Sequence, residues 1–196
     1  MNKNKAIELL KANVKNENLV RHNLAVGYSL GSIYDYLKAN NWKNDSPDSK
    51  DTWEILGFVH DSDWELTKDD ITKHTLMTLD WLKSEGVLET DPLYLAISSH
   101  NTKRTNLKDV ESQMEWALEC VDELTGFVVA VAMVKGKLLA NVEVSSVIKR
   151  FKEKAFAAAV HREQITQVAE KLEIPIEKFV EITLTTMQNH SNELGM

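Results

Sequence analysis

The sequence predicts an all-α fold. Glycine and proline, which most often interrupt helices, number only seven and three among 196 residues. Apolar residues recur at intervals of three or four through most of the chain, which is the period of an amphipathic helix. A chain of this length can bury one sizeable core, so we expect a single domain over 1–196, with its core at about 18–135 and a C-terminal helical extension at about 140–196.

Two helices and a polar connection are expected at the N-terminal end. Residues 4–14 have the composition of a short helix. From Leu19 to Leu37 the apolar positions step by three or four, and His22 lies on that apolar face. The polar stretch 40–51 then predicts an exposed loop.

The next segment ends in an adjacent histidine and aspartate. Its apolar run, 53–59, fits a buried helix, and the run is followed by His60 and Asp61. An ionised carboxylate in such a place requires a cationic partner, because burying an unpaired charge is costly. Adjacent helical residues point in different directions, so one target can engage both only near a helix end. The polar residues up to Asp63 indicate such an end.

Two further helices each bring one histidine to an apolar face. A capping-box pattern at 67–70 predicts a helix that carries His74 on its inward face and ends at Gly86. An Asp-Pro start at 91–92 predicts a second helix that closes at His100.

The longest helix is expected in the second half of the chain. Its apolar stripe runs through 112–134, with Asp122 beside the stripe, and Gly136 ends it. The last part of this segment is apolar nearly all round, as expected for a central buried helix. Two more helices are predicted at 153–172 and 176–189.

Charge and composition exclude several classes of protein. A formal net charge of −7 argues against binding long nucleic acid through the overall field. The longest apolar stretch, 124–134, is too short to cross a bilayer, and the charged N-terminus leads into an amphipathic segment, not a signal core. Cys120 is the only cysteine and lies among apolar neighbours, so it is expected in the core. We therefore expect a cytoplasmic protein without a membrane partner.

Ligand-type side chains recur at or beside the apolar faces of five expected helices. They are His22, His60, Asp61, His74, His100 and Asp122. A single buried histidine is more often satisfied by a backbone carbonyl, but so many in one small domain would be costly to satisfy separately. Imidazoles with carboxylates suit Fe, Mn, Zn, Ni or Co better than Ca. The set divides well between two divalent ions if one carboxylate bridges them, and the remaining positive charge would attract an anionic substrate such as phosphate.

The order H…HD…H…H…D resembles the signature of the HD-domain superfamily of metal-dependent phosphohydrolases. The resemblance extends over most of the chain to small bacterial and archaeal HD-domain proteins. Four segments carry it besides the ligands: His-Asp-Ser-Asp-Trp-Glu at 60–65, Ile-Ser-Ser-His-Asn at 97–101, Val-Asp-Glu-Leu-Thr-Gly at 121–126 and the stretch 146–156.

The resemblance implies a helical bundle with a metal site at its centre. It implies that His22, His60, Asp61 and Asp122 hold a first ion, and that a second ion is held by His74 and His100 with Asp61 bridging. The implied activity is hydrolysis of a small phosphorylated substrate (a nucleotide, phosphomonoester or phosphodiester) by water that the metal activates. Asp63 is a candidate catalytic acid beside Asp61, orienting a ligand or the water, or else an ordinary helix-end cap or a solvated acid.

The sequence departs from the family where substrate would bind. Many HD hydrolases carry a lysine shortly after the HD pair, and here Asp63 and Trp64 occupy that region. Lys73, Asn101 and Arg104 are candidate replacements, with a plain surface role as the alternative for each. A basic run follows later in the chain and fits either a solvated helix face or the mouth of the site; it comprises Lys149, Arg150, Lys152 and Lys154. The remaining histidines, at 161 and 190, do not match the signature.

Two other functions remain open on the sequence alone. The same ligand pattern resembles the HD-type di-iron oxygenases, which cleave C–H or C–P bonds. A non-catalytic module that binds metal or a small phosphorylated ligand would also explain the pattern. The segment after Ala140 could be a lid, a homodimer surface or support for the core.

Overall fold

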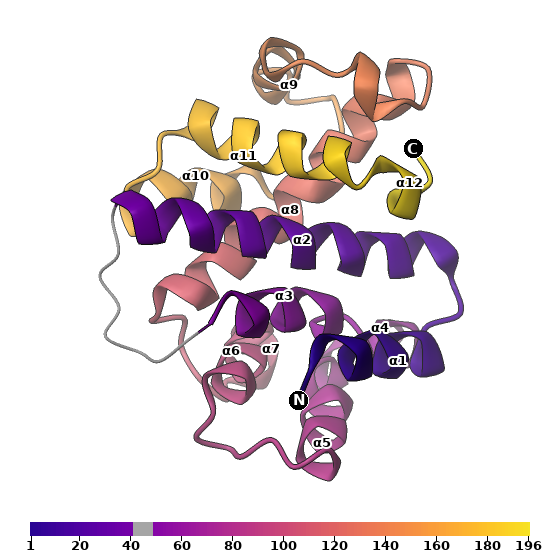
Figure 1. The fold of residues 1–196 in the computed structure, drawn as a ribbon, viewed down its shortest axis with the longest axis vertical. Helices are drawn as coiled ribbons and strands as arrows, with labels where there is room; N and C mark the ends of the chain where they lie inside the picture. Colours follow the sequence, from indigo (N-terminus) through magenta and orange to yellow (C-terminus); the bar gives the residue numbers. More distant parts are fainter. Residues whose placement is uncertain (41–48) are drawn as a thin grey trace.

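The computed structural model describes residues 1–40 and 49–196, and over these residues the chain forms helices and no strand (Figure 1). The all-α prediction is therefore confirmed. The helices are α1 (Lys3–Asn13), α2 (Glu17–Asn40), α3 (Lys50–Val59), α4 (Trp64–Thr67), α5 (Leu76–Ser84), α6 (Pro92–His100), α7 (Thr102–Thr105), α8 (Gln113–Val134), α9 (Val144–Phe151), α10 (Arg162–Lys171), α11 (Ile176–Asn189) and α12 (Ser191–Leu194), with short 3-10 turns η1 (Ile71–Lys73) and η2 (Leu139–Asn141). Most of the loop expected at 40–51 lies outside the described residues.

Helices α2, α3 and α8 form the centre of the molecule (Figure 1). α2 packs against α3 on one side and against α11 on the other, and α8 crosses behind it. α8 begins with a capping box between Ser112 and Glu115, as its predicted start requires, and its buried side chains include the thiol-bearing Cys120. Among the described residues, every helix is too short or too polar to span a membrane.

The contact between α2 and α3 depends on two glycines. A Cβ atom at Gly57 would lie 2.4 Å from the Cα of Gly27, and one at Gly27 would lie 2.3 Å from Phe58. Because glycine has no side chain, the two backbones can approach closely at these positions, and any larger residue would clash. This crossing brings His22 of α2 near His60 at the end of α3, with their ring centroids 5.3 Å apart.

The helix predicted from 67–70 to Gly86 is wrong in its first half. The chain forms α4 and η1 there, and the following helix, α5, begins only at Leu76. Thr75 adopts a left-handed conformation with φ of 80°. The N-terminus of α5 is capped by a residue distant in the sequence: the carboxylate of Asp63 accepts hydrogen bonds from the backbone N–H groups of Thr75 and Thr78. His74 thus lies in an irregular segment and not on a helix.

The helix predicted at 153–172 is also shorter than expected. A separate helix, α9, ends at Phe151, and α10 begins only at Arg162. The Arg162 guanidinium donates hydrogen bonds to backbone carbonyls of the intervening stretch, including that of Glu153, and stacks over Phe127. A half-buried cation that satisfies these carbonyls stabilises a turn where an alanine-rich sequence favours a helix.

Candidate metal centre

Four histidines point their Nε2 atoms at the same two carboxylates. In one half of the cluster, Nε2 of His22 lies 2.9 Å from Oδ1 of Asp122, and Nε2 of His60 lies 3.5 Å from the same oxygen. In the other half, Nε2 of His74 and of His100 lie 3.2 and 3.5 Å from Oδ1 of Asp61. The sequence-predicted ligand set of His22, His60, Asp61, His74, His100 and Asp122 is therefore gathered in one place.

Asp61 lies between the two halves. Its Oδ1 atom faces His74 and His100, while its Oδ2 atom lies 3.9 Å from Nε2 of His22 and 3.8 Å from that of His60. The backbone N–H of Asp61 donates to the side chain of Asn23 on α2, which fixes the turn that follows α3. One carboxylate thus presents a separate oxygen to each histidine pair.

The outer nitrogen of each histidine has its own partner. Nδ1 of His74 lies 2.8 Å from the Asp63 carboxylate, and Nδ1 of His100 lies 3.2 Å from that of Glu119. For His60 the partner is the carbonyl of Gly57 at 2.8 Å, and for His22 it is the Thr125 hydroxyl at 3.4 Å. A partner on Nδ1 fixes the ring and leaves Nε2 free for a ligand, as in protein metal sites.

The geometry meets the requirements of metal binding. Three groups of side chains offer ligand atoms that lie within 4.8 Å of one another: His22 with His60 and Asp61, His60 with His100 and Asp122, and Asp61 with His74 and His100. Nε2 of His60 is fully buried and has no hydrogen-bond partner among the described residues. A buried nitrogen is rarely left unsatisfied. These buried groups could hold a metal ion.

The cluster lowers the pKa values of its two acids. Burial alone would raise the pKa of Asp61, but the neighbouring histidines, His60 above all, hold it well below its usual range. Burial would likewise raise the pKa of Asp122, and the hydrogen bond from His22 together with the nearby His60 lowers it instead. Both carboxylates are therefore ionised and able to bind a cation near neutral pH.

The same contacts raise the pKa values of three histidines. Burial disfavours the charged imidazole and lowers the pKa of His22, His74 and His100, yet the net shift of each is upward from 6.5. Hydrogen bonds to Asp122, for His22, and to Asp61, for the other two, cause the increase. Without metal, these imidazoles therefore bind protons more readily than a free histidine does, and a cation would compete with those protons.

A cavity of about 790 Å³ opens onto one half of the cluster. Asp61, His74 and His100 line its inner end, and Trp64 and Trp116 line its walls. This volume is in the range of small-molecule sites in proteins. In the other half the side chain of His60 has no exposed surface, whereas those of His22 and Asp122 are 23% and 21% exposed.

The candidate substrate residues divide between this cavity and the surface. Asn101 and Arg104 line the cavity, and the Asn101 amide also donates to the carbonyls of Ile71 and His74, which fixes the segment before α5. Lys73 lies outside the cavity and pairs with Asp70. Of the basic run, Lys149 and Arg150 border a different cavity, between α8 and α9.

Glu119 and its partner Gln164 were not identified from the sequence as residues of the site. Glu119 holds His100 and accepts a hydrogen bond of 2.6 Å from Gln164 on α10. Its spacing of three residues before Asp122 on the same predicted helix was the available signal. Asp63 is fully buried and contacts His74, whereas its alternative as a solvated acid does not fit the structure.

The two remaining histidines lie outside the cluster. His161 lines the outer cavity and pairs with Glu163, and its side chain is largely exposed. The ring of His190 stacks on Tyr28 at 3.8 Å between centroids.

Comparison with protein-family models, curated proteins and solved structures found no match to this chain.

Proposed function

We propose that this protein is a metal-dependent phosphohydrolase of the HD-domain type, with its metal site at the centre of the helical bundle. The observation that carries the proposal is the convergence of four Nε2 atoms on Asp61 and Asp122, with every outer nitrogen held by a partner. The order of these residues in the chain also resembles the HD signature.

The ligand positions favour two divalent transition ions. His22, His60 and Asp122 with Oδ2 of Asp61 form one set, and His74 and His100 with Oδ1 of Asp61 form the other. Mixed imidazole and carboxylate ligands suit Fe, Mn, Zn, Ni or Co. When bound, such ions lower the pKa of water and neutralise charge on phosphoryl oxygens.

Some residues near the cluster would orient the metal-binding histidines, and others would bind the substrate. Asp63 and Glu119 hold His74 and His100 in one orientation at the open side of the cluster. Arg104 and Lys103 line the cavity on that side and supply positive charge for an anionic substrate. Acidic side chains such as Asp109 and Glu163 also line it, and they would disfavour long polyanions. A small phosphomonoester, nucleotide or phosphodiester is the substrate class that these features favour.

The test is phosphate release under anaerobic conditions from a panel of small phosphate esters. The protein would be loaded with Mn²⁺, Ni²⁺ or Co²⁺, and His60→Ala and Asp61→Ala would be compared with wild type. We expect metal-stimulated release in wild type and none in either variant. His190→Gln, which removes a histidine outside the cluster, serves as the control for metal content.

Three results would contradict the proposal. Unchanged phosphate release in both variants would remove the cluster from the reaction. Substrate-dependent oxygen uptake by the iron-loaded protein, without phosphate release in any metal form, would indicate an oxygenase instead. Thermal stabilisation by phosphorylated ligands without any turnover would indicate a binding module.

A further inference from the structure

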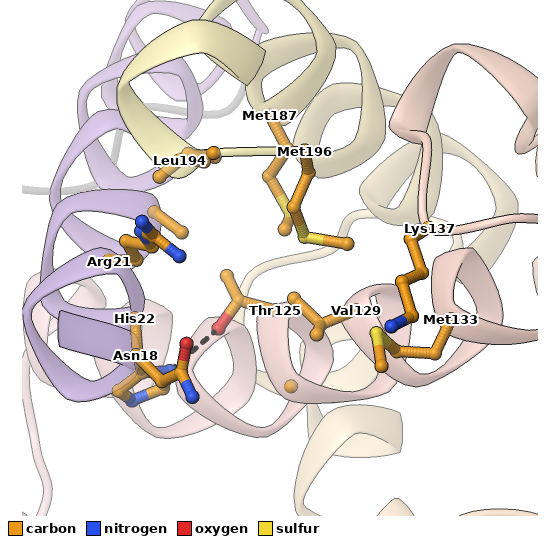
Figure 2. A pocket seen from close by; sticks show the side chains of 13 residues that line it. Asn18, Arg21, His22, Thr125, Val129, Met133, Lys137, Met187, Leu194 and Met196 are labelled. Carbon is orange, nitrogen blue, oxygen red and sulfur yellow. Dashed lines mark hydrogen bonds between the residues drawn. The ribbon is translucent and has the colours of Figure 1, made fainter. Parts of the chain in front are cut away.

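A second cavity, of about 520 Å³, lies between α2, α8 and the C-terminal helices (Figure 2). Most of its wall is apolar, and Met133, Met187 and Met196 approach it from different sides (Figure 2). Methionine side chains are flexible and adapt to the shape of an apolar guest. The volume is again in the range of small-molecule sites.

A glycine in α8 keeps one wall of this cavity open. Gly126 lies inside the helix, where glycine is less favourable than alanine. A Cβ atom built at Gly126 would meet nothing within 4 Å, so no packing contact requires the glycine. This position differs from Gly57, where a close helix contact excludes every side chain. The structure thus contains apolar space that a single methyl group would begin to fill.

The charged residues of this cavity have one sign. Arg21 and Lys137 line it together with the Asn18 amide, and no aspartate or glutamate does so among the described residues (Figure 2). The whole chain has 30 acidic and 23 basic residues, so a site with two cations and no acid is unlike the average surface. Arg21 pairs only with Glu17, whose side chain is 82% exposed, and Lys137 forms no ion pair within the described ranges.

We propose that this cavity binds an amphipathic anion, with an apolar chain among the methionines and a carboxylate or phosphate head at Lys137, while Arg21 adds positive charge on the opposite side (Figure 2). The apolar walls favour burial of a hydrocarbon chain, and the two cations favour a negative head over a neutral or positive one. His22 is the one residue shared with the metal cluster. The proposal does not depend on the activity proposed above, because binding here needs no ion in that cluster.

Four ligands with the same ten-carbon chain test the proposal by calorimetry: decanoate, decyl phosphate, decanol and decyltrimethylammonium. We expect decanoate or decyl phosphate to bind about tenfold more tightly than decanol, the ratio for one charge-assisted contact. Decyltrimethylammonium should not bind detectably. Tighter binding of decyl phosphate than of decanoate would indicate a phosphate head, and the reverse order a carboxylate. Equal binding of all four ligands would overturn the proposal.

Two variants locate the binding site. Gly126→Leu should abolish decanoate binding, because its side chain would project into the cavity. Lys137→Asn should weaken binding about tenfold by removing the charge; asparagine also tolerates the positive φ of 64° at this position. Lys135→Asn is the matched control, since it changes the net charge equally and lies outside the cavity. If Lys137→Asn and Lys135→Asn both bind decanoate as wild type does, the cavity is not the site.

Discussion

The two histidine pairs of the cluster are held in different ways. His22 and His60, the neutral-partner pair, direct their outer nitrogens at a hydroxyl and a backbone carbonyl. His74 and His100, the carboxylate-partner pair, direct theirs at Asp63 and Glu119. A carboxylate behind a ligating histidine raises its basicity and fixes its orientation more strongly than a neutral acceptor does.

The difference follows from where each pair lies. The neutral-partner pair is carried by the closely packed helices α2 and α3, whose own backbone holds the rings in position. The carboxylate-partner pair lies at the open cavity, with His74 in an irregular segment and His100 at the last residue of α6. Rigid packing supports the first pair, and buried charges support the second.

Removing the carboxylate that lies between the two histidine pairs should disrupt both pairs at once. Asparagine has only one side-chain oxygen and no negative charge, so in Asp61→Asn it cannot present a charged oxygen to each histidine pair. We expect metal content to fall for both pairs and phosphate release to fall by more than about 100-fold. Loss of a residue that only contacts a metal ligand already lowers metal affinity or activity by about 10- to 100-fold, and loss of a ligand should cost more. Elemental analysis and an activity assay measure these changes.

Asp109→Asn is the control for that variant. Asp109 lines the same cavity but lies outside the three ligand groups. It should retain full metal content. Full metal content in Asp61→Asn as well would show that Asp61 is not a ligand.

The neutral-partner pair should be the more sensitive to helix packing. Gly57→Ala places a Cβ against the backbone of α2, and we expect it to lower the free energy of unfolding by about 2 kcal/mol or more. The same substitution at Gly126 meets open space and should raise that free energy by about 0.5–1 kcal/mol through helix propensity. Urea denaturation of both metal-free variants would measure the two effects. Shifts of the same sign would contradict the packing argument.

The sequence predicted the members of the cluster better than their surroundings. His22, His60, His100 and Asp122 could be placed because the helical period puts each on or beside an apolar face, and periodicity is a local property of the chain. The structure brings them together with His74 and Asp61.

The surroundings depend on contacts between distant residues, which periodicity does not reveal. Asp63 replaces a local cap for α5, so the capping pattern at 67–70 predicted the wrong start. Arg162 similarly stabilises the turn that divides the predicted helix at 153–172. The position of Lys73 outside the cavity follows from the same irregular segment.

The carboxylate-partner pair should be the more sensitive to loss of charge behind the rings. Glu119→Gln keeps an acceptor for His100 but removes the charge, and we expect the affinity of that pair for its ion to fall by about 10- to 100-fold. Asp63→Asn should act in the same direction and also destabilise α5, whose N–H groups it caps. Titration with Co²⁺, followed by absorbance, would resolve the two binding steps.

Thr125→Val is the matched change behind the neutral-partner pair. It removes the hydroxyl that contacts His22 at 3.4 Å. It should weaken the binding step of the neutral-partner pair, and by less than Glu119→Gln weakens that of the carboxylate-partner pair. If Glu119→Gln weakened both steps equally, the two pairs would not be separate sites.

The smallest expected effect is on stability as a function of pH. The raised pKa values of His22, His74 and His100 stabilise the metal-free fold fully below 6.5, the unfolded value, and this stabilisation is lost as pH rises through the folded values. The lowered pKa values of Asp61 and Asp122 act oppositely, with stability lost as pH falls below 3.8. The Tm of the metal-free protein should therefore fall as pH rises from 6.5, because the free energy of unfolding decreases by no more than about 1.4 kcal/mol per pH unit for each histidine.

Metal should reverse the sign of that slope. Ions bind neutral imidazoles, so raising the pH above 6.5 favours binding and should raise the Tm of the metal-loaded protein. Thermal scans from pH 6 to 8, with and without Mn²⁺, measure both slopes. His74→Gln and His100→Gln should each flatten the metal-free slope, as should His22→Gln, whereas His190→Gln should not. Equal slopes with and without Mn²⁺ would mean that metal and protons do not compete for these nitrogens, and the cluster would then be a network of ion pairs alone.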